Sequence, residues 1–362
     1  MPDNHLPPYQ QETISVKPIS HADNTFASTV TGWGDPRFTA RARFIPVPEK
    51  LNKVPRGKFR LEDEARLFFR VLQAARRERV MLLFSSRGYL KPELLATAVI
   101  GLWPRRKRPF IVFYGEMYEP NTDWRRFIEP LLMKLADRAV FRFAVHSQAE
   151  VPVFAQLWGI DEAKVRGCSF YHKKAGPGVT VADKPRGRHI FAGGTSFRDY
   201  EPLLAAARLL PDHEFVIATN RLDNHPDIPP NVRAGLVTPA EFDQLIDTAA
   251  AVVVPLRQDV HRIIGMLTYL QAMWAKKPTI VSDTLGVREY VTDGETGLIV
   301  SGTPESYVAA IQWVLDPAND GRIRQMCAAA HRAVSQQFTI EAHVTRLLEI
   351  MDEATAAASP RA

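Results

Sequence analysis

The stretch that most constrains the fold of this chain runs from 264 to 300 and reads IGMLTYLQAMWAKKPTIVSDTLGVREYVTDGETGLIV. Gly265 stands before a helical pattern, and a buried strand (278–283), a short helix (287–291) and a glycine turn (293–297) follow. Helices that alternate with short apolar strands predict a parallel sheet covered on both faces. The stretch is therefore typical of one half of a nucleotide-binding α/β domain.

The same alternation extends along most of the 362 residues, a length that favours two domains. We expect strands at 80–86, 109–115, 140–147, 189–194, 214–219 and 251–256. Helical spacing marks 61–79 and 124–139, the second interrupted by Pro130, and FTARARFIPV (38–47) is interpreted as a further strand. The sequence therefore predicts an α/β protein.

Changes in composition suggest the domain boundaries. Residues 1–25 are polar and aperiodic, which predicts disorder. One α/β domain is expected over 26–174 and another over 188–338, with a Gly/Pro-rich linker (175–187) between them and a closing helix in 339–362.

Composition excludes several classes of protein. Cys168 and Cys327 lie far apart and match no metal or redox spacing, which predicts two structural thiols, a reducing compartment and no metal site. There is no apolar leader pattern, and no apolar run approaches the ~18 residues of a membrane-spanning helix. We therefore expect a cytoplasmic protein that is at most peripheral to a membrane.

Charge divides the chain into a basic and an acidic half. Residues 1–184 carry 30 Lys and Arg against 19 Asp and Glu, whereas residues 185–362 carry 16 against 21. Candidate partners of the basic half are an anionic membrane, a pyrophosphate-linked lipid or nucleic acid. The run WPRRKR (103–108), with Arg76, Arg77 and Arg79, suits an anionic membrane surface, and the absence of a recognition motif argues against nucleic acid.

Two places in the second half are suited to a phosphate. In GGTSFRD (193–199), Gly193 and Gly194 follow a strand and allow close backbone approach, and Arg198 offers a bidentate charge. At the helix that follows Gly265, the first amides, those of Met266, Leu267 and Thr268, are expected to point at an anion. Farther along this helix, the Gln271 amide can bond a ribose hydroxyl. An ordinary turn and an ordinary helix start are the alternative interpretations.

These motifs, in this order, resemble the donor-sugar half of family 4 glycosyltransferases (glycosyl transferases group 1). The resemblance rests on a strand ending in GG, G-x-x-T-x-L-Q-A-M, KKPTIVSD and DGETGL; it covers 185–355 well and 60–175 loosely. It implies a GT-B fold, in which two Rossmann-like domains turn parallel sheets toward a central cleft and a C-terminal helix crosses back to the first domain.

The resemblance also implies roles for individual residues. Arg198 would hold the donor pyrophosphate, and Val237, at the end of NVRAGLV (231–237), would lie beside the nucleotide base. The family carries two glutamates eight residues apart, where this chain has Ile263 and Gln271, so its donor site departs from the common pattern. Glu289 matches a loop carboxylate that we interpret as structural support.

In the first half, Glu116 follows a strand where many family members carry a histidine that faces the cleft. A carboxylate there can orient or deprotonate an acceptor hydroxyl. Glu119, Asp123, His146 and Ser147 are alternatives, and GWGD (32–35) is the nearest candidate for a glycine-rich loop after the first strand.

The resemblance predicts a hexosyltransferase that moves sugar from a nucleotide-diphosphate sugar to an acceptor, without metal or cofactor and with retained configuration. A lipid-linked or polysaccharide acceptor at the inner membrane face fits the basic half. The alternatives are an inverting GT-B enzyme and a non-catalytic nucleotide-sugar-binding or scaffold protein.

Overall fold

The computed structural model divides the chain into two α/β units, Met1–Ser169 with His343–Ala362, and Phe170–Ala342. It describes residues 25–53, 61–84, 87–115, 119–121, 123–176, 179, 181–182 and 185–358. The predicted disorder of 1–25 therefore lies, apart from Thr25, outside the described residues. Residues 170–174, assigned to the first domain from the sequence, belong to the second unit.

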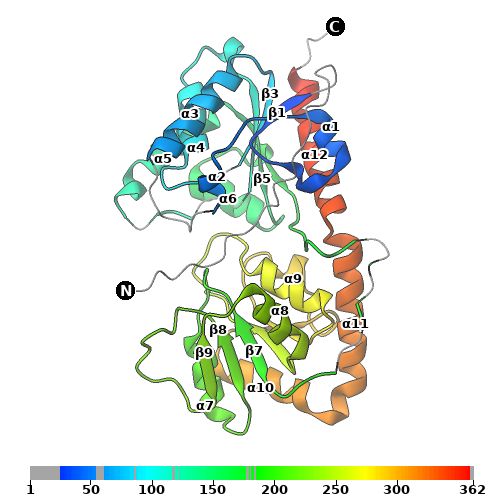
Figure 1. Ribbon diagram of the computed structural model, residues 1–362. Coiled ribbons are helices and arrows are strands. Elements are labelled where there is room, and N and C mark those ends of the chain that lie inside the picture. Colours follow the sequence, from blue (N-terminus) through cyan, green and yellow to red (C-terminus); the bar gives the residue numbers. More distant parts are fainter. Residues whose placement is uncertain are drawn as a thin grey trace. The chain divides into compact units, whose positions relative to one another are not determined.

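The first unit is built on a six-stranded parallel sheet in the order β2-β1-β3-β4-β5-β6 (Figure 1). Its strands are β1 (Phe26–Ser28), β2 (Ala42–Phe44), β3 (Val80–Phe84), β4 (Phe110–Tyr114), β5 (Val140–Val145) and β6 (Val165–Gly167). The runs in β3 and β4 are almost wholly apolar because both faces of a parallel sheet are covered.

Helices of the first unit cover the two faces of this sheet. The helices of this unit are α1 (Pro36–Arg41), α2 (Glu49–Lys53), α3 (Leu61–Ala75), α4 (Pro92–Ile100), α5 (Glu129–Asp137), α6 (Glu150–Trp158) and α12 (Ile340–Ala358). In Figure 1, α3, α4 and α5 lie side by side, and their buried side chains share one core with those of β3, β4 and β5. The last helix, α12, belongs to this unit from His343 onward.

Two sequence interpretations in the first unit are wrong. Residues 38–47 are not one strand, because the Asp35 side chain accepts from the Arg37 amide and begins α1, with Pro36 in its first turn; only Ala42–Phe44 is extended. Pro130 does not interrupt a helix. It stands in the first turn of α5, after the separate turn η3 (Trp124–Phe127).

The second unit carries another six-stranded parallel sheet, in the order β12-β11-β10-β7-β8-β9. Its strands are β7 (Ile190–Gly193), β8 (Phe215–Ala218), β9 (Val232–Gly235), β10 (Ala251–Val254), β11 (Thr279–Ser282) and β12 (Leu298–Val300). The strands expected from the sequence are confirmed, and β9, from NVRAGLV, is an edge strand. The described residues of the expected linker 175–187 form neither helix nor strand.

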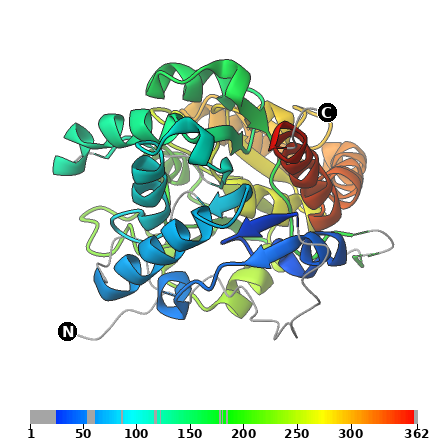
Figure 2. The same cartoon turned by 90° about the horizontal axis from the view of Figure 1, so that it is seen from above.

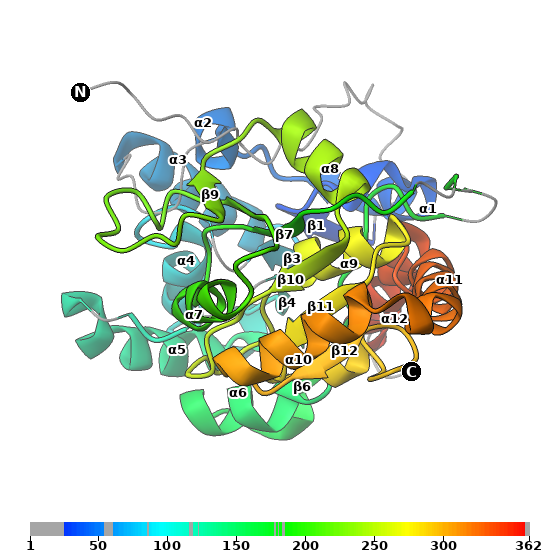
Figure 3. The same ribbon diagram turned by 90° about the horizontal axis from the view of Figure 1, so that it is seen from below.

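The helices of the second unit are α7 (Glu201–Leu209), α8 (Pro239–Thr248), α9 (Met266–Trp274), α10 (Pro304–Leu315) and α11 (Asp320–Gln337). Figure 3 shows α7 and α10 side by side, and their buried side chains form one core with Ile190 and Val253. The opposite face packs against α8 and α9 through Phe191 and Val252. Alternate residues of each strand thus enter different cores, as a doubly wound sheet requires.

Among the described residues, no helix is both long enough and apolar enough to cross a membrane. Both cysteines are buried and reduced, and burial raises the pKa of each thiol to about 12. Neither thiol is therefore an activated nucleophile.

Candidate functional site

The candidate site lies at the carboxyl edge of the second sheet. The first strand of this unit, β7, pairs with β8 on one side and with β10 on the other, so chain connections leave it in both directions. Open α/β sheets bind ligands at such switch points, beyond the carboxyl ends of the strands. Gly193, Ala218 and Val254 end the three strands there, and the segments that follow them form the site.

Arg198 is the central side chain of this site. It is only 6% exposed, and its Nε donates to the Gly193 carbonyl at 3.1 Å. Nη1 donates to the Ser196 carbonyl at 3.0 Å, and Nη2 to Thr268 Oγ1 at 2.9 Å. Backbone pairing of Arg198 with Leu256 fixes this segment beside the end of β10. The guanidinium is therefore held rigidly, in a direction set by β7 and α9.

The charge of Arg198 has no opposite partner in the described part of the chain. The titratable neighbours that act on its pKa are three tyrosines and Arg221, and no carboxylate is among them. Burial lowers the pKa of the guanidinium, but arginine remains protonated in proteins. A buried cation without a carboxylate is costly, and an anionic ligand would offset that cost.

Gly194 makes room for this guanidinium. Its φ of +110° is a conformation that favours glycine, and a Cβ added there would lie 3.0 Å from Arg198 Nη2. The glycine expected to allow close backbone approach thus allows the close approach of Arg198 itself.

The helix α9 begins beside Arg198, as the sequence predicted. Its N-cap, Gly265, has a φ of +81°, and a Cβ there would lie 2.9 Å from the Leu256 side chain. The Thr268 amide donates to the Gly265 carbonyl at 2.9 Å, so it is engaged within the first turn. Met266 is buried and Leu267 is 44% exposed. Of the three amides proposed for an anion, the first two fit that role better, and Thr268 contributes its hydroxyl.

A depression of about 480 Å³ opens next to Arg198. Arg198, Asp199, Arg221, Arg257, Gln258 and Asp259 line it. Arg221 follows β8 as Arg198 follows β7, and it donates to the Thr195 carbonyl at 3.0 Å. Three arginines and two aspartates thus line one hollow at the carboxyl edge, where Arg257 pairs with Asp259.

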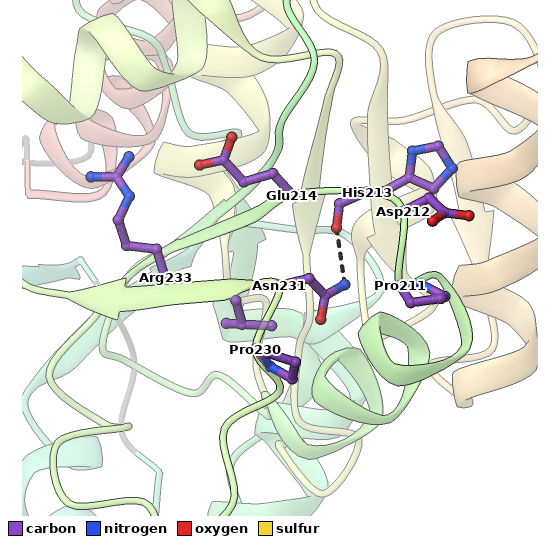
Figure 4. Close-up of a pocket in the computed structure, with 8 residues that line it drawn as sticks. Pro211, Asp212, His213, Glu214, Pro230, Asn231 and Arg233 are labelled. Atoms are coloured by element: carbon purple, nitrogen blue, oxygen red, sulfur yellow. Dashed lines mark hydrogen bonds between the residues drawn. The ribbon is translucent and has the colours of Figure 1, made fainter.

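A second depression, of about 340 Å³, lies at the opposite edge of the sheet, before β8 and β9 (Figure 4). Asn231 fills its base and donates to the carbonyls of Ala207, Leu210 and His213, the last contact being drawn in Figure 4. This asparagine ties the loop before β8 to α7 and needs no ligand. We therefore assign the functional site to the carboxyl edge.

Gln271 lies on α9 and is half buried. Its Nε2 donates to Asp243 Oδ1 on α8, and Asp243 Oδ2 accepts from Lys174 Nζ at 2.8 Å. A carboxylate is therefore present one side chain away from the position where the family resemblance expects a glutamate. Asp243 was not identified from the sequence, because its role depends on the packing of α8 against α9.

The remaining candidates in this unit lie as follows. Val237 follows the edge strand β9 and is half buried against the core. Ile263, the other replaced glutamate position, is a buried core residue. Glu289 is exposed on the turn η5 (Val287–Glu289) that Gly286 begins.

The first-unit candidates are less favourably placed. Glu116 lies outside the described residues. Asp123 accepts from the Arg125 amide and guanidinium, which hold the pKa of its carboxyl low, and Glu119 is half buried. His146 is buried with Nδ1 3.1 Å from the Cys168 carbonyl oxygen, and the buried Ser147 hydroxyl accepts from the Ala149 amide at 3.1 Å. His146 and Ser147 are thus held within the fold of the first unit, and their proposed role stays a prediction.

Comparison with known proteins shows what the second unit resembles. Residues 194–317 match the family model described as Glycosyl transferases group 1. Trehalose synthase of Pyrococcus horikoshii is 31% identical over 86 residues, which are 24% of this chain and 20% of that protein. The chain thus matches a fifth of the length of this curated relative.

Solved structures resemble nearly the whole chain. HepE of Anabaena in complex with UDP is 14% identical with a TM-score of 0.62, over 88% of this chain and 87% of that one. A glycosyltransferase from Rickettsia africae is 12% identical with a TM-score of 0.62, over 92% of this chain and 99% of that one. Sucrose-phosphate synthase of Thermosynechococcus elongatus is 16% identical with a TM-score of 0.60, over 88% of this chain and 84% of that one. The expected GT-B fold is confirmed, and residues 194–317 of the second unit are similar to glycosyl transferases group 1.

Proposed function

We propose that this protein transfers a sugar from a nucleoside-diphosphate sugar to an acceptor. One observation carries the proposal: Arg198 is a buried cation that has no carboxylate partner among the described residues, beside the N-terminus of α9 in the region similar to glycosyl transferases group 1. A pyrophosphate supplies the missing negative charge and suits the two-pronged guanidinium.

In this proposal Arg198 and the first turn of α9 stabilise the leaving nucleoside diphosphate. The hydrogen bonds to Gly193, Ser196 and Thr268 use three of the five guanidinium N–H groups, and the other two belong to Nη1 and Nη2. Thr268 accepts from Nη2, so its own hydroxyl hydrogen can be donated to a phosphate oxygen. Fixed donors aimed at developing charge lower the barrier to group transfer. We include transfer without a metal or cofactor in the proposal.

The ribose site in this proposal combines Gln271 with Asp243. The Gln271 amide is anchored through its Nε2, which leaves its oxygen as an acceptor for a ribose hydroxyl. Asp243 supplies a carboxylate from α8 in place of the glutamate that α9 lacks. Val237 lies beside the base in the same proposal.

UDP is the first nucleotide to test, since HepE has been solved with UDP and with UDP-glucose.

For the acceptor we propose a lipid-linked or polysaccharide hydroxyl at the inner membrane face. Glu116 is proposed as the group that orients or deprotonates this hydroxyl, and the sugar is transferred with retained configuration. The basic charge of the first half supports a phosphate-bearing acceptor.

Calorimetric titration of the full chain with UDP, UMP and uridine tests the donor site. We expect UDP to bind most tightly, because the second phosphate reaches Arg198 and α9. Equal affinity for UDP and uridine would contradict the proposal.

Slow release of glucose from UDP-glucose would then identify an enzyme. Tight UDP binding without hydrolysis, or without transfer to any acceptor offered, would favour the alternative of a nucleotide-sugar-binding scaffold, which the missing paired glutamates motivate.

A further inference from the structure

An exposed apolar surface on the first unit is not used by the proposed reaction. It lies on η3 and the outer side of α5 and consists of Trp124, Phe127, Ile128 and Leu131, which are 56%, 72%, 42% and 58% exposed. Leu102, 60% exposed, follows α4, which packs along α5. We call these five residues the apolar stripe. Figures 2 and 3 show the teal segment that carries η3 and α5 at the edge of the first unit.

The apolar stripe results from the way in which α5 packs on the first unit. After η3 a new helix, α5, begins at Glu129 with Pro130 in its first turn. Glu129 faces inward, where it is buried and pairs with Lys91. Met133 and Ala136 face the core. The opposite side of the same helix carries Leu131, Lys134 and Arg138, which have helical spacing and are all exposed. Large apolar side chains thus remain in water on a helix whose other face is fully packed.

Unpaired cations accompany the stripe. Arg126 lies over the Phe127 ring at 4.7 Å, and Lys134 and Arg138 continue along α5. At the other end, Arg105, Arg106 and Lys107 are exposed on the turn η2 (Arg105–Lys107), which is tied to α5 where Arg108 Nη1 donates to the Arg138 carbonyl at 2.8 Å. None of these six cations forms an ion pair with a described residue.

We propose that this surface lies on an anionic lipid bilayer. The apolar stripe enters the headgroup region, and the six cations meet lipid phosphates and carboxylates, each contributing about 1 kcal/mol near the surface. Tryptophan and phenylalanine flanked by arginine and lysine are typical of segments that lie in a membrane interface.

Other occupants fit the surface less well. A second copy of this chain, docked by the same surface, would set the six cations against the same six cations. Nucleic acid would satisfy the charges, but it offers no hydrocarbon environment for Ile128 and Leu131. The inference does not depend on the proposed sugar transfer, which uses the second unit.

Co-sedimentation of the full chain with vesicles tests the proposal. We expect binding to phosphatidylcholine vesicles that contain phosphatidylglycerol, weak binding to phosphatidylcholine alone, and loss of binding at high salt. The paired substitution Phe127→Asp and Leu131→Asp should weaken binding by about tenfold or more. Leu209→Asp is the matched control: Leu209 is 59% exposed on α7, and its substitution should change nothing.

UDP titration of the same variants separates this proposal from the proposed function, because the paired variant should keep UDP affinity whether or not it binds vesicles. Equal binding to neutral and anionic vesicles would overturn the proposal, as would unchanged binding by the paired variant. A concentration-dependent dimer that the paired substitution dissolves would also overturn it, and would assign the surface to self-association.

Discussion

The carboxyl edges of the two parallel sheets differ in how each holds a buried arginine. In the second unit this edge holds the buried cation Arg198 with Arg221 nearby, and no carboxylate pairs with Arg198 among the described residues. In the first unit the buried arginine beside this edge, Arg87, pairs with Glu93, and aromatic rings surround His343. Tyr114 ends β4 and its hydroxyl lies 2.8 Å from His343 Nε2, and the Trp33 ring lies 4.9 Å from that of His343.

This difference between the two edges indicates where an anionic ligand can bind. In the first unit Glu93 offsets the charge of Arg87, and burial lowers the pKa of His343 to about 3 and keeps its imidazole neutral. The positive charge of this unit is carried on the outer surface instead. The second unit, although acidic as a whole, buries one cation where a ligand can reach it. Net charge alone would direct an anion to the first half, whereas the buried cation that we propose for a phosphate lies in the second.

The largest expected effect comes from filling the space that Arg198 needs. Gly194→Ala places a Cβ 3.0 Å from the guanidinium at a φ of +110°. We expect the free energy of unfolding of the second unit to fall by about 2–4 kcal/mol, measured by urea denaturation.

Gly321→Ala is the matched control for this change. Gly321 lies in α11, and a Cβ there meets nothing within 4 Å, so the stability should stay the same or rise by up to about 1 kcal/mol. Equal effects of the two substitutions would remove the argument for a tight fit at Gly194.

Acid should act on the buried His343 of the first unit. The pKa of His343 is lowered from 6.5 to about 3 by burial, so below pH 6.5 the unfolded chain takes up a proton that the folded unit excludes. Folding stability should therefore fall as the pH falls from 6.5 toward 3, by up to about 1.4 kcal/mol per pH unit.

Urea denaturation of the first unit between pH 7 and pH 5 measures how its free energy of unfolding changes with pH. The substitution His343→Gln should reduce that change. His172, whose pKa burial lowers to about 4, gives the second unit a slope of the same sign, which His343→Gln should leave unchanged. A first-unit slope that survives His343→Gln would contradict the assignment.

A smaller effect is expected from Thr268→Val. The substitution keeps the shape but removes the acceptor of Arg198 Nη2 and the hydroxyl proposed for the phosphate. UDP affinity should fall by about three- to tenfold, or about 1 kcal/mol, in a calorimetric titration. Thr248→Val, at the exposed end of α8, serves as control and should bind UDP like the native chain. An unaltered affinity for both variants would exclude the hydroxyl from the site.

The smallest effect distinguishes ribose from phosphate. Asp243→Asn should weaken UDP binding a few-fold, through the lost carboxylate. It should leave the affinity for inorganic pyrophosphate unchanged, because that ligand has no ribose. Asp247→Asn on the same helix is the control. If pyrophosphate binding weakens equally, Asp243 acts through charge or stability and does not contact the ribose.

Local patterns explain which features were predictable from the sequence. Apolar runs between glycine turns identified the central strands, and a glycine pair followed by an arginine identified the segment after β7. The positions of Arg198 and Gly265 follow from such local signals. Residues 38–47 were misread because the Asp35 cap and Pro36 outweigh the strand propensity of the segment.

The features that sequence reasoning missed depend on contacts between distant segments. Arg198 is buried because Thr268, on a helix 70 residues away, accepts its hydrogen bond. Asp243 accepts from Gln271 only because α8 packs beside α9. Arg221 had a local signal, since it follows β8 as Arg198 follows β7, but nothing in the sequence indicated that both line one hollow.

The central claim is that the buried charge of Arg198 binds a nucleoside diphosphate, and UDP titration of Arg198→Ala tests it most directly. Arg208→Ala, which removes an exposed arginine on α7, is the matched control. Arg198→Lys keeps the positive charge but removes the planar guanidinium that can donate two parallel hydrogen bonds. We predict that Arg198→Ala weakens UDP binding by about thirtyfold or more, about 2 kcal/mol, that Arg198→Lys is intermediate and that Arg208→Ala is unchanged. A folded Arg198→Ala protein that binds UDP as tightly as the native chain would contradict the account.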